Sequence, residues 1–446
     1  MDKSKGWYIV EMKIKMFVCG PTVYDYMHLG NARTFVFFDV VAKYLRWRGN
    51  DLEYIQNITD SEDKIIARAK EHGREPADWA REWEVKFYED AKALGITSPV
   101  YKKAMDHIPE IISQVKRLIE KGNVYEIKGD GWYFDLSTFP DYGKLSGRTK
   151  LQDDDAVSRI DENENKRNKG DFCVWKGDFT TGRPGWHIED TAITEKYFGP
   201  QYDLHGGGQD LMFPHHEGEI AIMESLSGLK PFVKKWMHAG FLVTEGLNPS
   251  VSGLTPKMSK SKGNFITAHE ALKHHSPEAI RHYFLSAHYR SPLEYSDDAI
   301  APSEVAVSRL GEFYRKLLLS CETAKSTEAV SPLDAKQDFI AAMDDDFNAP
   351  KAMAVLFDLV GKIDPMTIDP EPILEFLNSV NKILGIIPTK QEPIPEEVQR
   401  LLADRNLARE MKNFALSDEI RIKIEELGWQ VEDTKYGPIL KPLPAH

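Results

Sequence analysis

Two short stretches, far apart in the sequence, carry side chains that can bind phosphate. The first is His28-Leu29-Gly30-Asn31, which follows a predicted strand and precedes a predicted helix. Exposed N–H groups at a helix N-terminus favour an anion, and His28 and Asn31 add side-chain donors. The second is Lys257-Met258-Ser259-Lys260, in an aperiodic stretch that suits a closing loop. Each alone also fits an ordinary turn or an exposed loop, but together they predict a triphosphate site.

Four further side chains are of the types that bind zinc. His215 and Glu219 lie four residues apart and share one face of a predicted helix. Cys19 ends the first predicted strand, and Asp190 precedes a later one. A thiolate, an imidazole and two carboxylates make a plausible zinc set that leaves about one negative charge once the metal is counted. The alternative is that His215 and Glu219 are ordinary polar residues in the first turn of a helix.

Polar and aromatic residues around these candidates indicate a small ligand pocket. Trp186 and His187 lie just before the candidate zinc carboxylate, and His205 and Asp210 flank a run of three glycines. If the surrounding strands form a parallel sheet, these side chains lie at its carboxyl edge, where ligands bind. Asp210 is suited to an ammonium group and Trp186 to a pocket wall. Each residue taken alone is more commonly a packing or turn residue.

The elements that must hold these residues begin with a strand–helix–strand unit. Apolar residues predict a strand at Met12–Val18, a helix at Thr34–Arg48 that stops at Gly49, and a second strand at Leu52–Ile58. A glycine-containing turn joins the first strand to the helix. This order is typical of a dinucleotide-binding fold, in which that turn faces the helix N-terminus.

An insertion is expected between two halves of one sheet. A helix is predicted just before the insertion, at residues 78–93, and another within it, at residues 108–120. Residues 124–127 and 132–135 are predicted to form a hairpin within the insertion. The nearly all-polar residues 152–170 indicate a loop. The second half of the sheet is expected to open with a strand at Phe172–Trp175, followed by a strand that ends at Gly208 and a helix opened by Pro214.

The remainder of the chain has mostly helical patterning. Apolar stripes at helical spacing cover Val305–Leu319, Phe339–Ile363 and Ile373–Leu384, which predicts a helix bundle. Before them, Thr244–Asn264 has no periodicity and suits a movable loop. After them, a proline-containing linker at Pro388–Pro395 leads to a small unit of helix and hairpin.

We therefore predict an α/β protein with a Rossmann-like parallel-sheet catalytic domain that contains an insertion. An α-helical bundle and a small C-terminal α+β unit follow it. The expected boundaries are 1–95 and 170–240 for the two halves of the catalytic domain, 96–169 for the insertion, 241–300 for a lid loop and its surroundings, 301–395 for the bundle and 396–446 for the terminal unit.

The composition narrows the class of protein. The 446 residues are 41% hydrophobic and 28% charged, as in a soluble globular protein of several domains. The three cysteines have no paired spacing, and no apolar run is long enough to cross a bilayer, so we expect a cytoplasmic protein without a membrane span. The net charge of −13 argues against a general nucleic-acid coat but allows a local basic face for one RNA.

These residues together resemble the cysteinyl-tRNA synthetase family, which belongs to the class I aminoacyl-tRNA synthetases. The matching motifs occur in one order from about residue 16 to residue 440, and several are specific to this family. They are Cys19-Gly20-Pro21-Thr22-Val23-Tyr24, His28-Leu29-Gly30-Asn31, Asn57-Ile58-Thr59-Asp60, Gly185-Trp186-His187-Ile188-Glu189, His205-Gly206-Gly207-Gly208, Phe213-Pro214-His215-His216-Glu217-Gly218-Glu219, Lys257 to Ser261, Met343-Asp344-Asp345-Asp346-Phe347-Asn348, Ala408-Arg409 and Val431-Glu432-Asp433-Thr434.

The resemblance implies a reaction in which ATP activates L-cysteine to cysteinyl-adenylate and the cysteinyl group then moves to the 3′ end of tRNA(Cys). Mg²⁺ would accompany ATP, and we expect a monomer with no editing domain. The tRNA would lie across the helix bundle and contact residues 241–300 with its stem, and the terminal unit would read the anticodon. The implied ATP-binding residues are His28, Gly30, Asn31, Lys257, Ser259 and Lys260, of which the two lysines, His28 and Asn31 take part in catalysis. The implied cysteine-binding residues are Thr59, Trp186, His205 and Asp210.

The family's catalytic zinc binds the substrate thiolate and is held by two cysteines, one histidine and one glutamate. Cys19, His215 and Glu219 match three of these positions, and Asp190 stands where the family usually has its second cysteine. A carboxylate keeps the ligand charge unchanged but donates less electron density than a thiolate. We therefore expect one catalytic zinc ion, bound less tightly than by two thiolates.

Two other functions remain open from the sequence. One is a ligase that joins activated cysteine to an amino-sugar, as mycothiol ligase does, since that family resembles the catalytic half of this chain. The C-terminal helices favour the tRNA enzyme instead. The other is a catalytically silent RNA-binding paralogue in which Asp190 is the relic of a lost zinc site, although both phosphate motifs are intact.

Overall fold

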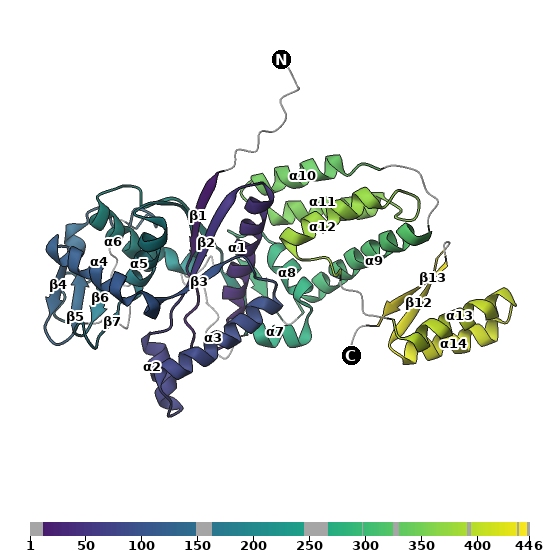
Figure 1. Ribbon diagram of the computed structural model, residues 1–446, viewed down its shortest axis with the longest axis horizontal. Helices are drawn as coiled ribbons and strands as arrows, with labels where there is room; N and C mark the ends of the chain where they lie inside the picture. The colour runs from purple at the N-terminus through teal and green to yellow at the C-terminus, as the bar shows by residue number, and fades with distance from the viewer. Residues whose placement is uncertain are drawn as a thin grey trace, which may run out of the picture. The chain divides into compact units, whose positions relative to one another are not determined.

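The computed structural model describes residues 12–148, 163–244, 266–296, 298–323, 330–389, 394–434 and 437–443. A five-stranded, all-parallel sheet organises the first of two compact units (Figure 1). Its strands, in spatial order, are β3 (Val100–Lys103), β2 (Asp51–Ile58), β1 (Lys13–Val18), β8 (Tyr202–Gly208) and β9 (Val233–Ala239). The chain moves to one side after β1 and to the other after β8, so the carboxyl ends of β1 and β8 form the crevice where such sheets bind ligands.

Helix α1 (Leu29–Trp47) covers one face of the sheet, beside β1 and β2 in Figure 1. Its Phe38 and Val41 pack in one apolar cluster with Met16 and Val18 of β1. The helix begins five residues before the predicted start, because His28 caps it through a hydrogen bond of 2.8 Å from the Gly30 N–H to Nδ1. The predicted strand–helix–strand unit is confirmed, with parallel pairing of β1 and β2.

The opposite face of the sheet carries α4 (Ile108–Glu120), α5 (Trp186–Phe198) and α6 (Glu217–Ser227). Phe17 and Ile55 of the sheet share an apolar cluster with these helices and with a second, antiparallel sheet. That sheet consists of β4 (Val124–Ile127), β5 (Gly131–Phe134), β6 (Phe172–Lys176) and β7 (Arg183–Pro184).

The strand expected to open the second half of the parallel sheet therefore lies elsewhere. Phe172–Lys176 pairs antiparallel with β5, and the rings of Phe172 and Phe134 stack at 5.2 Å between centroids. An isolated run of four apolar residues does not indicate which sheet it joins. The structure differs from the expected elements at two further places later in the chain. Trp186–Asp190 begins a helix instead of a connection, and the helix expected at Pro214 becomes regular only at Glu217, after an irregular turn at Met212–His216.

The first unit is completed by helices around α1 and by a short parallel pair, β10 (Leu242–Thr244) with β11 (Leu293–Tyr295). The helices before the long C-terminal part are α2 (Asp63–Glu71), α3 (Pro76–Ala93), α7 (Ala268–His274) and α8 (Pro277–Leu285). The later helices are α9 (Ala301–Thr323), α10 (Leu333–Asp344), α11 (Ala349–Lys362) and α12 (Glu371–Leu384). No helix among the described residues combines the length and the hydropathy of a membrane span.

The single helical stripe expected at Phe339–Ile363 is two helices, α10 and α11. Asp346 and Phe347 between them have φ angles of 55° and 53°, which end a right-handed helix. The carboxylate of Asp346 accepts hydrogen bonds from Arg290 at 2.6 and 3.0 Å and from the hydroxyl of Tyr289 at 3.0 Å. These tertiary contacts fix the break, so the apolar spacing alone could not reveal it.

The second unit comprises residues 308–331, 362–375 and 387–446. Its C-terminal part consists of α13 (Glu396–Glu410), α14 (Phe414–Glu426) and the antiparallel hairpin of β12 (Trp429–Thr434) and β13 (Gly437–Pro442). Val398, Ile424 and Trp429 belong to its core. Arg405 is buried and makes a bidentate pair with Asp433, with hydrogen bonds of 2.9 and 2.7 Å.

One buried cation holds together helices that are distant in the sequence. Arg281 of α8 is 2% exposed and donates hydrogen bonds to the backbone oxygens of Leu94 at 2.9 Å and Leu384 at 2.7 Å. Its guanidinium also lies 3.3 Å from the fully buried carboxylate of Asp39, which has a second cationic partner in Lys43 at 2.7 Å.

We expect Arg281→Met to lower the free energy of unfolding by about 3 kcal/mol. This value is at the low end of the cost of breaking a buried ion pair, because Lys43 remains beside Asp39. The measurement is urea unfolding followed by tryptophan fluorescence. Arg81→Met is the matched control, since Arg81 makes only an exposed pair with Asp78 and its loss should leave the midpoint unchanged. Equal midpoints for the two variants would contradict the expectation.

Candidate active site

A cavity of about 490 Å³ lies at the carboxyl ends of β1, β2 and β8. This volume is within the usual range for small-molecule sites. Eight residues singled out in the sequence line it: Cys19, His28, Asn31, Thr59, Trp186, Asp190, Asp210 and His215. Tyr24 and Asn57, which stand in the matching motifs without an assigned role, also line it, as do Thr34 and Lys64. Residues from the whole length of the sheet domain therefore converge on one cavity, as the parallel arrangement requires.

The N-terminus of α1 forms the phosphate-binding candidate. His28 and Asn31 line the cavity, and the Nδ1 atom of His28 accepts the hydrogen bond from Gly30 N–H that caps the helix. A Cβ atom at position 30 would lie 3.0 Å from His28 Nδ1, so glycine lets the capping histidine fold back over the turn. Lys257, Ser259 and Lys260 lie outside the described residues, and the structure describes only this first half of the predicted triphosphate site.

Six buried side chains meet beside the cavity, and we call them the Cys19 cluster. They are Cys19, Asp190, His205, His215, His216 and Glu219. Two groups of four among the described residues each bring one ligand atom per residue within 4.8 Å of the others. The pocket-facing set is Cys19, Asp190, His215 and Glu219, and the enclosed set is Cys19, His205, His216 and Glu219. Both sets share Cys19 and Glu219.

The pocket-facing set is the one expected from the sequence. His215 Nε2 lies 3.1 Å from Asp190 Oδ2 and 3.2 Å from Glu219 Oε1, and Glu219 Oε1 lies 3.9 Å from the sulfur of Cys19. The outer nitrogen of His215 is held by the ring of His187, at 2.9 Å between Nδ1 atoms. Imidazole, thiol and carboxylate groups from the residue after β1, from α5, from the turn Met212–His216 and from the start of α6 thus face one point.

The donor atoms of this set fit a zinc ion. Asp190 Oδ1 and Glu219 Oε2 are buried without a hydrogen-bond partner among the described residues, which is costly for carboxylate oxygens. One sulfur, one imidazole nitrogen and carboxylate oxygens are zinc's usual protein ligands, and a divalent cation would use the groups left unsatisfied. The residues therefore agree with the metal that the resemblance implies.

Burial controls the protonation of the cluster when no cation is bound. Burial, and then the nearby carboxylates of Asp190 and Glu219, raise the pKa of the Cys19 thiol, and burial raises the pKa of Glu219. Burial also lowers the pKa of His205 and of His216, so both imidazoles are neutral and able to bind a metal. A bound cation would favour the deprotonated thiol and carboxyl, and its binding would release protons.

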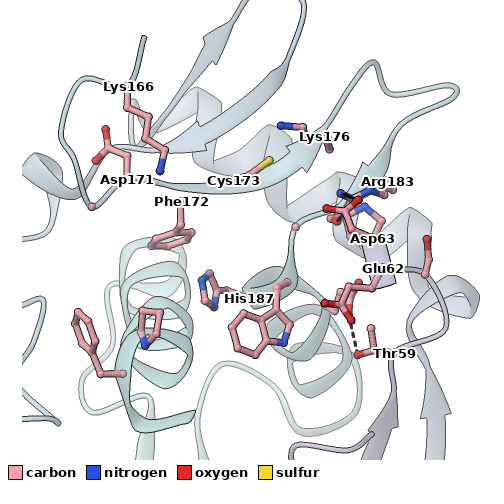
Figure 2. A pocket seen from close by; sticks show the side chains of 18 of the residues that line it. Thr59, Glu62, Asp63, Lys166, Asp171, Phe172, Cys173, Lys176, Arg183 and His187 are labelled. Carbon is pink, nitrogen blue, oxygen red and sulfur yellow. Dashed lines mark hydrogen bonds and ion pairs between the residues drawn. The ribbon is translucent and has the colours of Figure 1, made fainter. Parts of the chain in front are cut away.

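A smaller cavity of about 80 Å³ adjoins the first and shares Thr59 and Trp186 with it (Figure 2). The hydroxyl of Thr59 donates a 3.2 Å hydrogen bond to the buried carboxylate of Glu189. The indole of Trp186 stacks on the ring of His215, with centroids 4.3 Å apart and the planes 19° from parallel. Trp186 therefore connects the wall of the cavity directly to a candidate metal ligand.

Two predicted residues lie behind the cavity instead of lining it. His205 and Glu219 are fully buried, and the sulfur of Cys19 lies 3.3 Å from His205 Nε2. His187 is expected among the pocket residues; it lines the smaller cavity and supports His215. His216 joins the cluster, although it is expected only as part of a family motif. Their positions next to His215 and Trp186 were the available signal, and only the fold shows that their rings turn inward.

Comparison with known families agrees with this geometry. Residues 7–305 match the model of the tRNA synthetases class I (C) catalytic domain, and residues 338–387 match the DALR domain. A cysteine–tRNA ligase of Clostridioides difficile (strain 630) is 40% identical over 454 residues, which cover 96% of this chain and 95% of that protein. A cysteine–tRNA ligase of Thermococcus gammatolerans is 40% identical over 466 residues, with coverage of 97% and 95%.

A solved structure supports the fold. The methionyl-tRNA synthetase of Mycobacterium tuberculosis, bound by methionyl-adenylate, superposes with a TM-score of 0.58 at 16% identity and covers 84% of each chain. At this identity the likeness concerns the fold alone.

We expect Cys19→Ser to reduce bound zinc from about one ion per chain to none, because Cys19 is the sole sulfur ligand of both four-residue sets. The measurement is metal content by mass spectrometry after equilibration with excess zinc and gel filtration. Cys321→Ser is the control, since Cys321 is exposed and belongs to neither ligand set, and its loss should leave the metal in place. Zinc retained in full by Cys19→Ser would show that the cluster is not the metal site.

Proposed function

This chain belongs to the cysteine–tRNA ligase family of class I tRNA synthetases, and we propose that it selects its amino acid with a zinc ion bound in the Cys19 cluster. As a member of that family it activates L-cysteine with ATP and transfers the cysteinyl group to tRNA(Cys). The observation that carries the zinc proposal is the pocket-facing set, in which a thiol, an imidazole and two carboxylates meet at the edge of the ligand cavity.

We assign the ATP end of the cavity to the start of α1. His28 and Asn31 would hold the phosphates there, at a helix N-terminus that favours anions. Lys257, Ser259 and Lys260 would stabilise the departing pyrophosphate, and Mg²⁺ would accompany ATP. In the activation step the carboxylate of cysteine attacks the α-phosphate and pyrophosphate leaves, so the chain's task is to hold both substrates in line and offset the developing charge.

We assign the amino-acid end to the residues near the cluster. Asp210 would orient the ammonium group of cysteine, and Thr59 and Trp186 would form walls of the pocket. His205 lies behind the wall, with its Nε2 3.3 Å from the sulfur of Cys19 and its Nδ1 3.5 Å from Glu219 Oε2. It would therefore act through the cluster and not by direct contact with the substrate.

Selection against serine explains why a metal is needed at all. Cysteine and serine differ by one atom, and the size of a pocket distinguishes such a pair by about 1–3 kcal/mol. A selectivity of about 10⁴ needs about 5.5 kcal/mol. When bound, zinc would supply a soft Lewis acid that prefers a thiolate to an alcohol near neutral pH. The chain's part is to keep the ligands preorganised and the site closed to bulk water.

The terminal unit is the proposed contact to tRNA. Arg405 and Arg409 both pair with Asp433, at 2.7 and 2.6 Å, so Asp433 holds the guanidinium groups against the hairpin. Met411 and Phe414, at the turn between α13 and α14, are instead strongly exposed. Aromatic side chains exposed in this way suit stacking by unpaired bases of an anticodon loop.

The two other functions weighed from the sequence have less support. Relatives named cysteine–tRNA ligase match this chain over nearly its whole length, including the part that follows the catalytic domain. That coverage favours tRNA as the acceptor over an amino-sugar. The phosphate-binding candidates at the start of α1 and the complete donor set in the cluster favour an active enzyme over a silent paralogue.

We expect Asp190→Asn to raise the KM for cysteine by about 10- to 100-fold in ATP–pyrophosphate exchange, because an amide is a poor zinc ligand and the pocket-facing set loses one anion. The KM for ATP should stay unchanged. Asp203→Asn is the matched control: Asp203 lies on β8 and accepts hydrogen bonds from Lys15 and Lys234, away from the cavity. An unaltered KM for cysteine in Asp190→Asn would exclude Asp190 as a ligand for the thiol-binding metal.

We expect Phe414→Ala to raise the KM for tRNA while leaving ATP–pyrophosphate exchange intact. The loss of one stacked base is worth about 1–3 kcal/mol, which is about a 5- to 150-fold change. Steady-state aminoacylation and exchange are measured on the same preparation, with Val85→Ala on α3 as a control of similar exposure. An unchanged KM for tRNA with exchange intact would contradict the assignment.

A further inference from the structure

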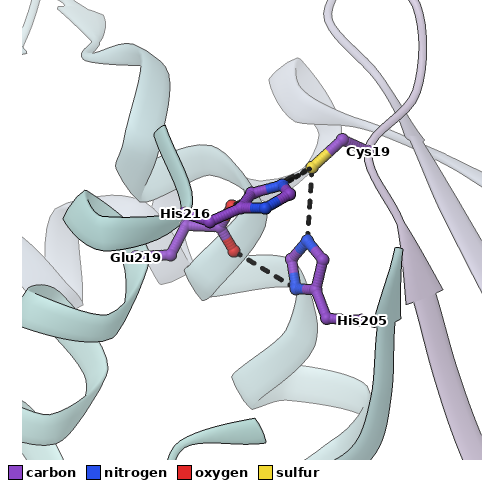
Figure 3. A group of neighbouring side chains, drawn as sticks. All are labelled: Cys19, His205, His216 and Glu219. Carbon is purple, nitrogen blue, oxygen red and sulfur yellow. Dashed lines mark hydrogen bonds and ion pairs between the residues drawn. The ribbon is translucent and has the colours of Figure 1, made fainter. Parts of the chain in front are cut away.

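The enclosed set is built as completely as the pocket-facing set. The sulfur of Cys19 lies 3.3 Å from His205 Nε2 and 3.2 Å from His216 Nε2 (Figure 3). Glu219 Oε1 lies 3.9 Å from the same sulfur and 4.0 Å from His216 Nε2. A tetrahedron with zinc–sulfur bonds of about 2.3 Å and zinc–nitrogen bonds of about 2.0 Å places sulfur and nitrogen about 3.5 Å apart. The observed distances are close to that value.

Both histidines of the enclosed set have their outer nitrogens held. The Nδ1 atom of His205 lies 2.5 Å from the hydroxyl of Tyr202, and the Nδ1 atom of His216 lies 2.8 Å from Nε2 of His238. Metal-binding histidines are commonly fixed in this manner, because the outer contact sets the ring orientation and the tautomer. In each ring the nitrogen left over points at Cys19.

The two sets differ in charge. With zinc, a thiolate, two carboxylates and one imidazole, the pocket-facing set keeps one net negative charge. With zinc, a thiolate, one carboxylate and two neutral imidazoles, the enclosed set is neutral. Every ligand of both sets is buried, and an uncompensated buried charge is costly. Asp190 stays buried beside His215, with its Oδ2 3.1 Å from Nε2, whichever set holds the metal, so the charge of the whole cluster is the same and the donor types decide between the sets.

The two sets also differ in access. His205 and His216 do not line the cavity and are fully buried, whereas Asp190 and His215 line it. Both sets have four protein ligands, but only Cys19 of the enclosed set lines the cavity, so a metal there would be closed off by protein, as is typical of a structural zinc site. A metal in the pocket-facing set lies at the cavity wall, where a substrate thiol can reach it.

We propose that the cluster offers zinc two mutually exclusive positions, and that without cysteine the metal occupies the enclosed set of Cys19, His205, His216 and Glu219. The two positions share Cys19 and Glu219, so an ion bound at one position prevents a second ion from binding at the other. Cysteine binding then favours the pocket-facing set, because the substrate's sulfur is an additional soft ligand there. This inference rests on the proposed zinc function and adds a resting position for the metal.

Asp190 is the residue that decides between the positions. A carboxylate at this place makes the pocket-facing set poorer in soft ligands than the enclosed set, which has one sulfur and two nitrogens. Asp190→Cys would give the pocket-facing set two sulfurs. We therefore infer that the aspartate moves the resting metal inward and that a cysteine would return it to the cavity wall.

Zinc K-edge X-ray absorption distinguishes the positions directly. The full chain is loaded with one equivalent of zinc without cysteine, and the numbers of sulfur and imidazole ligands are fitted. We expect one sulfur and two imidazoles in the unaltered chain, and two sulfurs with one imidazole in Asp190→Cys. One sulfur with one imidazole in the unaltered chain would overturn the inference but leave the zinc function standing. A chain that binds no zinc would overturn both.

Two further variants test the ligands without relying on activity. Asp190→Asn should still bind about one zinc, because the enclosed set keeps all four ligands, whereas His216→Asn should lower zinc affinity at least about tenfold. His107→Asn is the matched control: His107 is also buried, but its Nδ1 lies 2.7 Å from the backbone oxygen of Lys103, outside the cluster. Loss of zinc from Asp190→Asn, or unchanged affinity in His216→Asn, would contradict the enclosed position.

Discussion

The parallel pairing of β1 with β8 is the interaction on which the site depends. It places Cys19 beside His205, although 186 positions separate them in the sequence, and the Cys19 N–H donates a 3.0 Å hydrogen bond to the Gly206 oxygen. A Cβ atom at Gly206 would lie 2.3 Å from the ring of Phe38, so α1 can pack against this strand only because the residue is glycine. The pairing of β1 with β8 thus brings the candidate phosphate-binding turn, the candidate metal ligands and the cavity to the same edge of the sheet.

Much of this arrangement follows from the sequence, because its signals are local. The strand–turn–helix at the N-terminus, the amphipathic α4 and the i, i+4 spacing of His215 and Glu219 each depend on residues close in the chain. Sheet membership is not local, so the strand at Phe172 was placed in the wrong sheet. The break between α10 and α11 was missed for the same reason, since Arg290 and Tyr289 stabilise it from another part of the chain.

The candidate metal site shows a similar division. Residue types predict Cys19, Asp190, His215 and Glu219 as candidate zinc ligands, and the fold brings them together. Residue types could not show that the ring of His216 also points at the sulfur of Cys19. Adjacent residues on a regular helix point in different directions, so His215 and His216 are not expected to face the same site. The irregular turn at Met212–His216 before α6 changes that rule locally. Sequence spacing therefore predicted one ligand set where the structure has two.

Six donors for four positions also make the cluster redundant. A site with only four donors loses its metal when any one of them changes, so a substitution at a ligand passes through a metal-free protein. Here the enclosed set contains neither Asp190 nor His215, and either residue can change while a complete set remains. Such redundancy lets the residue at position 190 change between a soft and a hard ligand while the protein keeps a complete set of metal donors.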